Sequence, residues 1–227
     1  MQPSINKLLS FADVISLTNG LLGSFSIFLL FSGYTYPAFV FLLVALLADG
    51  VDGMVARKTK KGPLGMYFEA MADMVSLSIA PMMFVFSLYT SVLDVDIVLR
   101  IIFFIVAGMY LMFSSIRLAS FHILTSNEYF VGLPVSAAMI YLVMLSFLQV
   151  PLYGILGVAF VVSLAMISKI RFPKLNLHFN AIAAILIVAT ILLGKSFMGV
   201  APIVLLVALT CYIIGGVVLL YRKEKKK

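Results

Sequence analysis

Apolar stretches about as long as a membrane-spanning helix recur along the whole chain, separated by short polar connectors. About 20 mostly apolar residues are needed to cross the hydrocarbon core of a bilayer as a helix. Eight segments meet this requirement, at about 14–33, 36–57, 64–92, 97–124, 131–149, 152–169, 178–195 and 198–221. The chain lacks the alternation of apolar and polar residues that is typical of strands. The pattern therefore predicts an all-α, polytopic membrane helical bundle of about eight transmembrane helices.

The polar segments add detail to this picture. Residues 1–12 predict a short amphipathic helix that lies on the membrane surface ahead of the first span. The connector at 58–63 is basic and turn-prone, and Pro37, Pro151 and Pro173 mark further breaks because proline ends or kinks helices. The second, third and fourth spans each carry polar residues towards one end, and these are the candidate catalytic and binding residues.

The composition excludes an ordinary water-soluble domain. The 227 residues are 63% hydrophobic and 11% charged, with a mean hydropathy of +1.18, whereas soluble domains carry roughly 25% charged residues. The single cysteine, Cys211, excludes an internal disulfide and a cysteine-based metal cluster. It lies in an apolar run, so we interpret it as a small packing residue.

The net charge of +7 reflects membrane orientation and not a nucleic-acid groove, because the basic residues lie at the edges of apolar runs. With the N-terminus in the cytoplasm and eight spans, 14 of the 16 Lys and Arg residues fall on the cytoplasmic side. Only Arg100 and Lys195 fall outside. We therefore predict a multi-pass cell-membrane protein with both termini cytoplasmic, and no nucleic-acid partner.

Four carboxylates interrupt segments that otherwise read as membrane spans: Asp49 and Asp52 near the end of the second, and Glu69 and Asp73 near the start of the third. A charge at the centre of a membrane helix costs roughly 2.5–3.5 kcal/mol on insertion scales. The spacings i, i+3 and i, i+4 place each pair on one helix face. The short connector at 58–63 predicts that the two helices are antiparallel neighbours, with both pairs at the same depth near the cytoplasmic edge.

Four carboxylates together repel one another unless protons or cations neutralise them. Hard cations such as Mg²⁺ take oxygen ligands and commonly bridge substrate phosphates. Two such ions about 3.5–4 Å apart suit an in-line displacement at phosphorus. The glycines beside the acids, Gly50, Gly53 and Gly65, allow close approach of either a ligand or another helix. Arg57 is either a phosphate contact or a marker of membrane orientation.

The run DGVDGMVARKTKKGPLGMYFEAMAD at 49–73 resembles the signature of the CDP-alcohol phosphotransferases, D-x2-D-G-x2-A-R, a spacer, and G-x3-D-x3-D. The matching positions are Asp49, Asp52, Gly53, Ala56, Arg57, Gly65 and Asp73. The third acid of the signature is Glu69 and not aspartate, which keeps the carboxylate but lengthens its reach by one methylene.

The resemblance implies an enzyme that transfers a lipid phosphate group from a CDP-activated lipid to an alcohol and releases CMP. It implies that Asp49, Asp52, Glu69 and Asp73 hold two metal ions, Mg²⁺ or Mn²⁺, and that Asp73 is also the general base. It further implies that Gly53, Ala56 and Arg57 line the nucleotide site. A general base within hydrogen-bond reach accelerates attack by a hydroxyl about 10²–10⁴-fold.

Four further segments resemble the phosphatidylserine synthase branch of this family: DVISLTNGLLGSFSI at 13–27, SSIRLASFHI at 114–123, FVGLPVSAAMI at 130–140 and SKIRFPK at 168–174. The resemblance implies L-serine as the acceptor. We expect one membrane domain over 1–227, with a catalytic core at about 13–174. The two-helix extension at about 175–227 is interpreted as bundle or dimer scaffold, and we expect a homodimer among membrane lipids.

The acceptor's carboxylate needs a cationic partner, and Arg117 is the candidate because a guanidinium binds a carboxylate bidentately. Its alternative role is a membrane-orientation charge. Thr18 and Asn19 either contact the cytidine or sugar of the CDP-lipid or hydrogen-bond to a neighbouring helix. His122 is interpreted as an interfacial bystander.

Two alternative functions remain open at the level of sequence. Glycerol phosphate or inositol phosphate as acceptor would require more basic residues around the pocket than Arg117 supplies. A cation transporter would place its acids near mid-depth on broken helices, whereas here they lie at the predicted cytoplasmic ends. Lys169 and Arg171 are interpreted as orientation charges, with a phosphate contact as the alternative.

Overall fold

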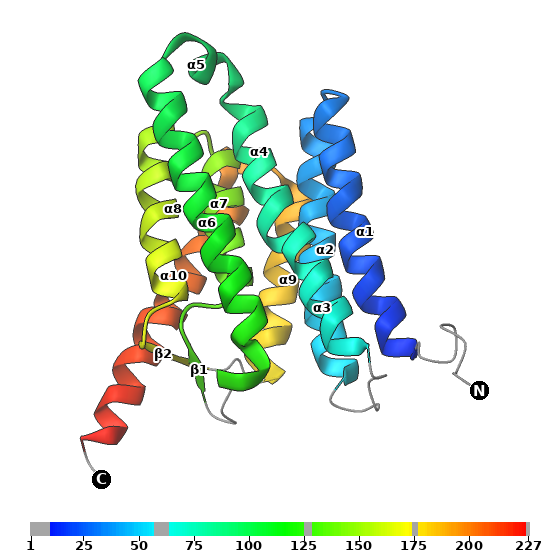
Figure 1. Ribbon diagram of the computed structural model, residues 1–227, viewed down its shortest axis with the longest axis vertical. Helices are drawn as coiled ribbons and strands as arrows, with labels where there is room; N and C mark the ends of the chain where they lie inside the picture. Colours follow the sequence, from blue (N-terminus) through cyan, green and yellow to red (C-terminus); the bar gives the residue numbers. More distant parts are fainter. Residues whose placement is uncertain (1–9, 57–63, 125–128, 174–176, 226–227) are drawn as a thin grey trace. The chain divides into compact units, whose positions relative to one another are not determined.

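The computed structural model describes residues 10–56, 64–124, 129–173 and 177–225, and these divide into two compact units, Met1–Ser87 and Leu88–Lys227. The predicted all-α class is confirmed, because nearly all described residues are helical (Figure 1). The predicted surface helix at 1–12 lies mostly outside the described residues. The first unit contains α1 (Phe11–Phe31), α2 (Thr35–Ala56), α3 (Gly65–Asp73), the π-helix η2 (Met74–Ile79) and α4 (Ala80–Leu88).

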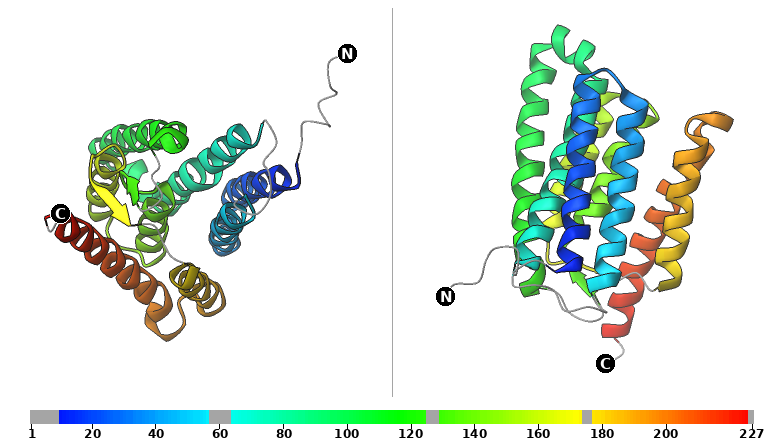
Figure 2. Two further views of the ribbon diagram at one scale, coloured as in Figure 1. Left: turned by 90° about the horizontal axis from the view of Figure 1, so that it is seen from below. Right: turned by 90° about the vertical axis from the view of Figure 1, so that its right-hand side faces the viewer.

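Helix α1 begins at a capping box and packs along α2, α3 and η2. The Ser10 hydroxyl accepts from the Asp13 backbone N–H, and the Asp13 carboxylate accepts from the Ser10 N–H at 2.7 Å. This exchange satisfies two amides that the helix start would leave without partners. The chain then turns through Gly33, at φ +80°, into α2, which runs antiparallel to α1 at its side (Figures 1 and 2).

The third predicted span, 64–92, is a helical rod interrupted by a π-helical turn. Helix α3 leads into η2 directly after Asp73, and α4 continues to Leu88. Within this turn the Ala80 N–H donates to the Val75 carbonyl, five residues back. A π-turn accommodates an extra residue without ending the helix, so hydropathy alone does not reveal it.

The second unit contains longer helices joined by a small two-stranded sheet. Its elements are α5 (Thr90–Val95), α6 (Ile97–Leu124), β1 (Tyr129–Val131), α7 (Val135–Phe147), α8 (Leu152–Met166), β2 (Arg171–Pro173), α9 (Leu177–Leu193) and α10 (Ser196–Glu224). Helix α6 packs against α7 and α8, whereas α10 packs against α9, α7 and β2. Phe197–Gly199, at positive φ, produce a kink near the start of α10.

The two strands lie almost entirely in connectors between predicted spans, where no strand was expected. Strand β1 pairs antiparallel with β2, with Phe130 opposite Phe172. Each strand has three residues, which is too short for an alternating pattern to be recognised. Gly132 follows β1 at φ +80° and donates to the Ile170 carbonyl. The fifth predicted span, 131–149, is consequently shortened to the helix Val135–Phe147.

The helices are those of a membrane protein. Four stretches in the described residues are long and apolar enough to cross a bilayer: Asp13–Phe31, Gly65–Leu88, Ile97–Phe121 and Ser196–Arg222. Shorter apolar helices cover Thr35–Val51, Val135–Phe147, Leu152–Met166 and Phe179–Leu193. Each predicted apolar segment is thus represented by a helix, while the number that spans the membrane stays a prediction.

Candidate active site

The acidic motif occupies the end of α2 and the whole of α3. Asp49 is half-buried on α2, and Asp52 follows it by three residues on the same helix. The side chains of Asp52, Gly53 and Ala56 lie outside the described set, and Arg57 lies outside the described residues. The roles predicted for these four residues stay predictions.

On α3, Glu69 is half-buried and Asp73 is buried. Helix α1 packs against both α2 and α3, while α2 contacts the third helical rod at η2. Helix α1 thus packs beside both of the helices that carry the acids, a contact that the hairpin spacing alone does not predict. Among the side chains that are described, no three His, Cys, Asp or Glu residues form a metal-binding group. The acids of the motif offer carboxylate oxygens as ligands, and Mg²⁺ and Mn²⁺ prefer oxygen ligands.

A hydrogen bond across two helices holds the buried acid. Asn19 Nδ2 on α1 donates to Asp73 Oδ1 on α3 at 2.8 Å, and both residues are buried. Thr18, the other polar residue predicted in this segment, is exposed and its hydroxyl donates to the Val14 carbonyl of its own helix. The structure therefore brings Asn19 to the candidate base and directs Thr18 away from it.

Asp13 is a buried acid outside the acidic motif. It is 1% exposed, and its Oδ1 has no hydrogen-bond partner among the described residues. Asp13, Ser16 and Asn19 are spaced by three residues and are all buried, so they form a polar stripe on α1. The signal was available, because S-x-x-D before an apolar run is a capping-box pattern and the i, i+3 spacing continues from it.

Arg117 is buried near the end of α6, at 5% exposure, which differs from the exposed position of an orientation charge. Its guanidinium lies over two aromatic rings, with Cζ 5.6 Å from the Phe121 centroid and 5.9 Å from the Phe130 centroid. Within the described residues its Nε has no hydrogen-bond partner. A buried guanidinium with an unused donor is suited to bind an anionic group.

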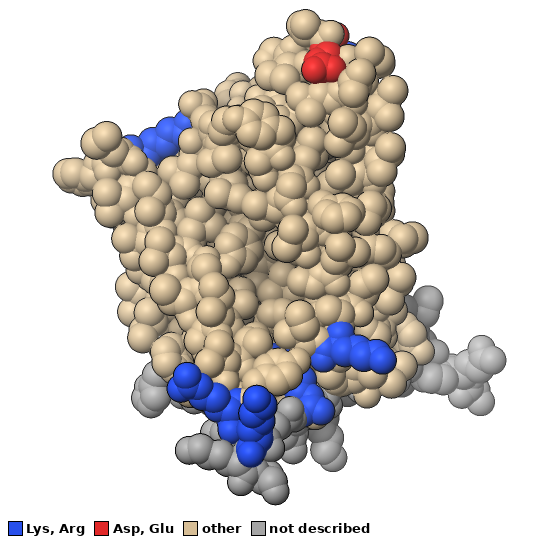
Figure 3. Space-filling view, turned by 90° about the vertical axis from the view of Figure 1, so that its left-hand side faces the viewer, with Lys and Arg blue, Asp and Glu red and all other residues tan. Residues whose placement is uncertain are grey.

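The other basic residues of the second unit follow the ends of its helices. Lys169 is exposed, and Arg171 on β2 stacks over Tyr129, with Cζ 4.8 Å from the ring centroid. Arg100 pairs with Asp94 at 2.8 Å near the opposite end of α6. In Figure 3 most visible basic side chains gather at one end of the face, and the acidic ones lie at the other. The side chain of His122 lies outside the described set.

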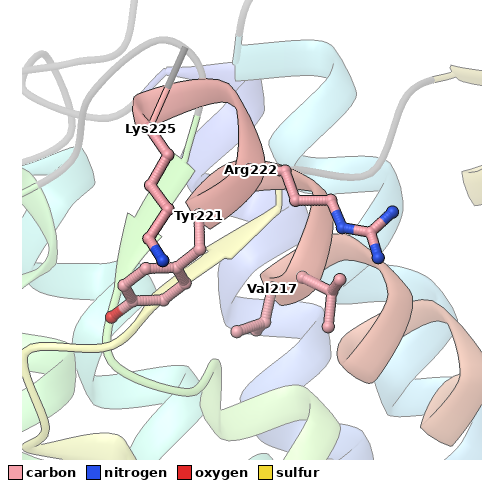
Figure 4. Close-up of a pocket in the computed structure, with 5 residues that line it drawn as sticks. Val217, Tyr221, Arg222 and Lys225 are labelled. Carbon is pink, nitrogen blue, oxygen red and sulfur yellow. The ribbon is translucent and has the colours of Figure 1, made fainter. Parts of the chain in front are cut away.

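An open hollow of about 340 Å³ lies along the last turns of α10 (Figure 4). Its lining residues are Val217, Val218, Tyr221, Arg222 and Lys225. Tyr221 and Lys225 lie side by side, and Arg222 is directed away from them. None of the described lining residues carries a carboxylate.

Comparison with known proteins assigns the class that the motif indicates. The profile of the CDP-alcohol phosphatidyltransferase family matches residues 9–220, which include all the described site residues. The chain belongs to the CDP-alcohol phosphatidyltransferase family.

The chain is also similar to several enzymes of this family whose activities are named. Archaetidylserine synthase of Methanothermobacter thermautotrophicus is 30% identical, over 76% of this chain and 73% of its own length. A CDP-diacylglycerol–serine O-phosphatidyltransferase of Helicobacter pylori is 31% identical, over 75% of this chain and 74% of its own. The enzyme of that name from Bacillus subtilis is 30% identical, over 73% and 90%.

Proposed function

We propose that this chain transfers a phosphatidyl-type group from a CDP-activated lipid to the hydroxyl of L-serine, releasing CMP. One observation carries the proposal: the family match over 9–220 contains the acidic motif, and relatives covered over most of their length are named for serine. The buried Arg117, with its unused Nε, supports an acceptor that has a carboxylate.

The reaction is a displacement at phosphorus. Asp73 accepts the proton of the serine hydroxyl, the serine oxygen forms a bond to the phosphorus of the lipid phosphate, and the bond from that phosphorus to the CMP oxygen breaks. CMP leaves with the electron pair of that bond. Asn19 restrains the Asp73 carboxylate through the 2.8 Å hydrogen bond, so the base is oriented before serine arrives.

Asp49, Asp52, Glu69 and Asp73 would hold the divalent cations, which we propose to be Mg²⁺ or Mn²⁺ because carboxylate oxygens suit these ions. When bound, the two ions neutralise charge on the pyrophosphate and on the departing CMP. Gly53, Ala56 and Arg57 would line the nucleotide site beside them. Thr18 has no described contact that supports a nucleotide role.

Arg117 would bind the serine carboxylate. Two parallel N–H···O bonds from one guanidinium fix both the position and the orientation of a carboxylate. The rings of Phe121 and Phe130 restrict the guanidinium through cation–π contacts. Selection of serine over ethanolamine would follow from this contact, because ethanolamine lacks the carboxylate.

The proposal extends to the membrane. Eight spans with both termini in the cytoplasm would place the acids at the cytoplasmic face, where water-soluble serine and CMP can exchange. The distribution of basic residues supports this orientation. A homodimer is proposed with it, with the last two helices as the scaffold.

The proposal is tested with purified protein, Mg²⁺ or Mn²⁺, and CMP release measured against a panel of acceptors. The panel contains serine, ethanolamine, glycerol phosphate and inositol phosphate, each with CDP-diacylglycerol and with a CDP-activated ether lipid. We expect release with serine and little with the others. Release with glycerol phosphate or inositol phosphate in place of serine would keep the family chemistry and reject the acceptor.

A further inference from the structure

The hydrogen bond to the Asp73 carboxylate fixes which way the side-chain amide of Asn19 points. An ionised carboxylate only accepts hydrogen bonds, so the group 2.8 Å from Asp73 Oδ1 must be the Asn19 NH₂. Asn19 is 2% exposed and Asp73 8% exposed. The Asn19 Oδ1 has no partner within the described residues. The hydrogen bond to Asp73 is therefore the one described contact that accounts for burying this amide.

Two glycines on α1 allow the close approach that this hydrogen bond requires. A Cβ on Gly20 would lie 3.1 Å from the Ala72 Cα, and a Cβ on Gly23 would lie 2.6 Å from the Ser76 Cα. The second distance is shorter than real Cβ contacts, and its partner is backbone, so one helix would have to move. The glycines contact residues on either side of Asp73 in sequence, which fixes the register of α1 against it.

The backbone changes its geometry directly after Asp73. The π-helix η2 begins at Met74, and Ser76, which Gly23 contacts, lies within it. Single π-turns inside α-helices are frequent at functional sites. The side chain of Asp73 is thus placed by three features: the α3 backbone before it, the π-turn after it, and the Asn19 amide across from it.

From these contacts we infer that Asn19 is a positioning residue for Asp73. Gly20 and Gly23 allow α1 to come close enough for the Asn19–Asp73 hydrogen bond to form. This inference rests on the proposed function, in which Asp73 is the base. Of the two roles predicted for Asn19, it favours the hydrogen bond to a neighbouring helix over the contact with the nucleotide. Asn19 acts through the carboxylate and not on the substrates, so its loss lowers the turnover rate and leaves substrate affinities nearly unchanged.

The test compares Asn19→Ala with Ser26→Ala. Ser26 is a matched control because it is also buried on α1 and also uses its side chain in a hydrogen bond to another helix element, the Ala38 carbonyl at 2.9 Å. We expect Asn19→Ala to lower kcat roughly 10- to 100-fold, which corresponds to about 1.4–2.7 kcal/mol. The KM values for serine and CDP-lipid should change less than about threefold. Ser26→Ala should keep wild-type kcat.

A second pair of variants leaves both side chains of the hydrogen bond in place. Gly23→Ala should lower kcat in the same way, because its Cβ separates α1 from η2. Gly108→Ala on α6 is the control, since a Cβ there meets nothing within 4 Å. Asn19→Asp should lower kcat at least as much as Asn19→Ala, because two carboxylates in contact repel. Thermal unfolding of each variant separates lost positioning from lost folding.

A readout independent of turnover is Mn²⁺ binding without substrates, followed by electron paramagnetic resonance. Because Asp73 is also a proposed ligand, Asn19→Ala should weaken Mn²⁺ binding several-fold, and Ser26→Ala should not. Unchanged kcat and Mn²⁺ binding in Asn19→Ala, or a tenfold rise in the KM for CDP-lipid at wild-type kcat, would overturn the inference. Absence of CMP release by the wild-type enzyme would instead reject the proposed function.

Discussion

Single carboxylates carry the chemistry proposed here, and each is accessible to substitution. Asp49→Ala, Asp52→Ala and Asp73→Ala should each abolish CMP release, with a loss of about 10²–10⁴-fold for the base alone. The folded yield should be retained, because these acids serve metals or a proton and not the apolar core. The control is Asp94→Ala, which removes a surface acid paired with Arg100. Wild-type turnover in any of the three would reject the two-metal assignment.

Glu69 is the position where the motif departs from its family pattern. If its carboxylate holds a metal ion, Glu69→Asp should retain partial activity, because aspartate keeps the charge on a shorter stem. Glu69→Gln should retain almost none, because an amide supplies no negative charge. CMP release at saturating Mg²⁺ and Mn²⁺ measures both variants. Full activity in Glu69→Gln would remove this residue from the metal site.

Arg117 tests the choice of acceptor. Arg117→Lys keeps a positive charge but loses the planar fork, so a bidentate contact becomes a single one. Hydrogen bonds to charged groups contribute about 1.5–3 kcal/mol, so the KM for serine should rise roughly 10- to 100-fold. CDP-lipid binding should stay nearly constant, and ethanolamine should remain a poor acceptor. An unchanged serine dependence would place the serine pocket elsewhere.

At the scale of elements, hydropathy predicts where helices lie but not how they are modified. The apolar pattern located α6 to the residue, because 97–124 is bounded by polar residues on both sides. It missed η2, since a π-turn changes backbone geometry without changing hydrophobicity. It also missed the β1–β2 pair, whose residues are brought together across α7 and α8. The local sequence of either strand does not indicate a partner that lies about 40 residues away along the chain.

Gly132 tests the element-level account of the second unit. At φ +80° a side chain is disfavoured, and a Cβ there would lie 2.1 Å from the Met166 carbonyl oxygen. Gly132→Ala should therefore lower the thermal midpoint in detergent, with a cost of at least about 1–2 kcal/mol from the left-handed backbone alone. Gly157→Ala on α8, where a Cβ meets nothing within 4 Å, should not. Equal midpoints for both variants would contradict this packing.

At the scale of the whole molecule, the family and the chemistry were predictable because the motif is local: eight positions within 25 residues, all readable from the sequence. The role of α1 was not predictable, because the Asn19–Asp73 contact joins residues 54 positions apart. Nor was the burial of Arg117 distinguishable from an orientation charge, since both place an arginine near a helix end. Both the contact of Asn19 and the burial of Arg117 depend on residues that are distant in the sequence, and a hydropathy pattern holds no information on such contacts.

The reaction proposed for this chain is a group transfer in which one CMP is released for each serine incorporated into lipid. The most direct measurement follows both products in one reaction, with purified protein, CDP-diacylglycerol, isotope-labelled serine and Mg²⁺ or Mn²⁺. We predict equal amounts of CMP and serine-labelled lipid, both lost in Asp73→Ala and both absent without serine. CMP release that continues without serine, or labelled lipid that fails to form while CMP accumulates, would contradict the account.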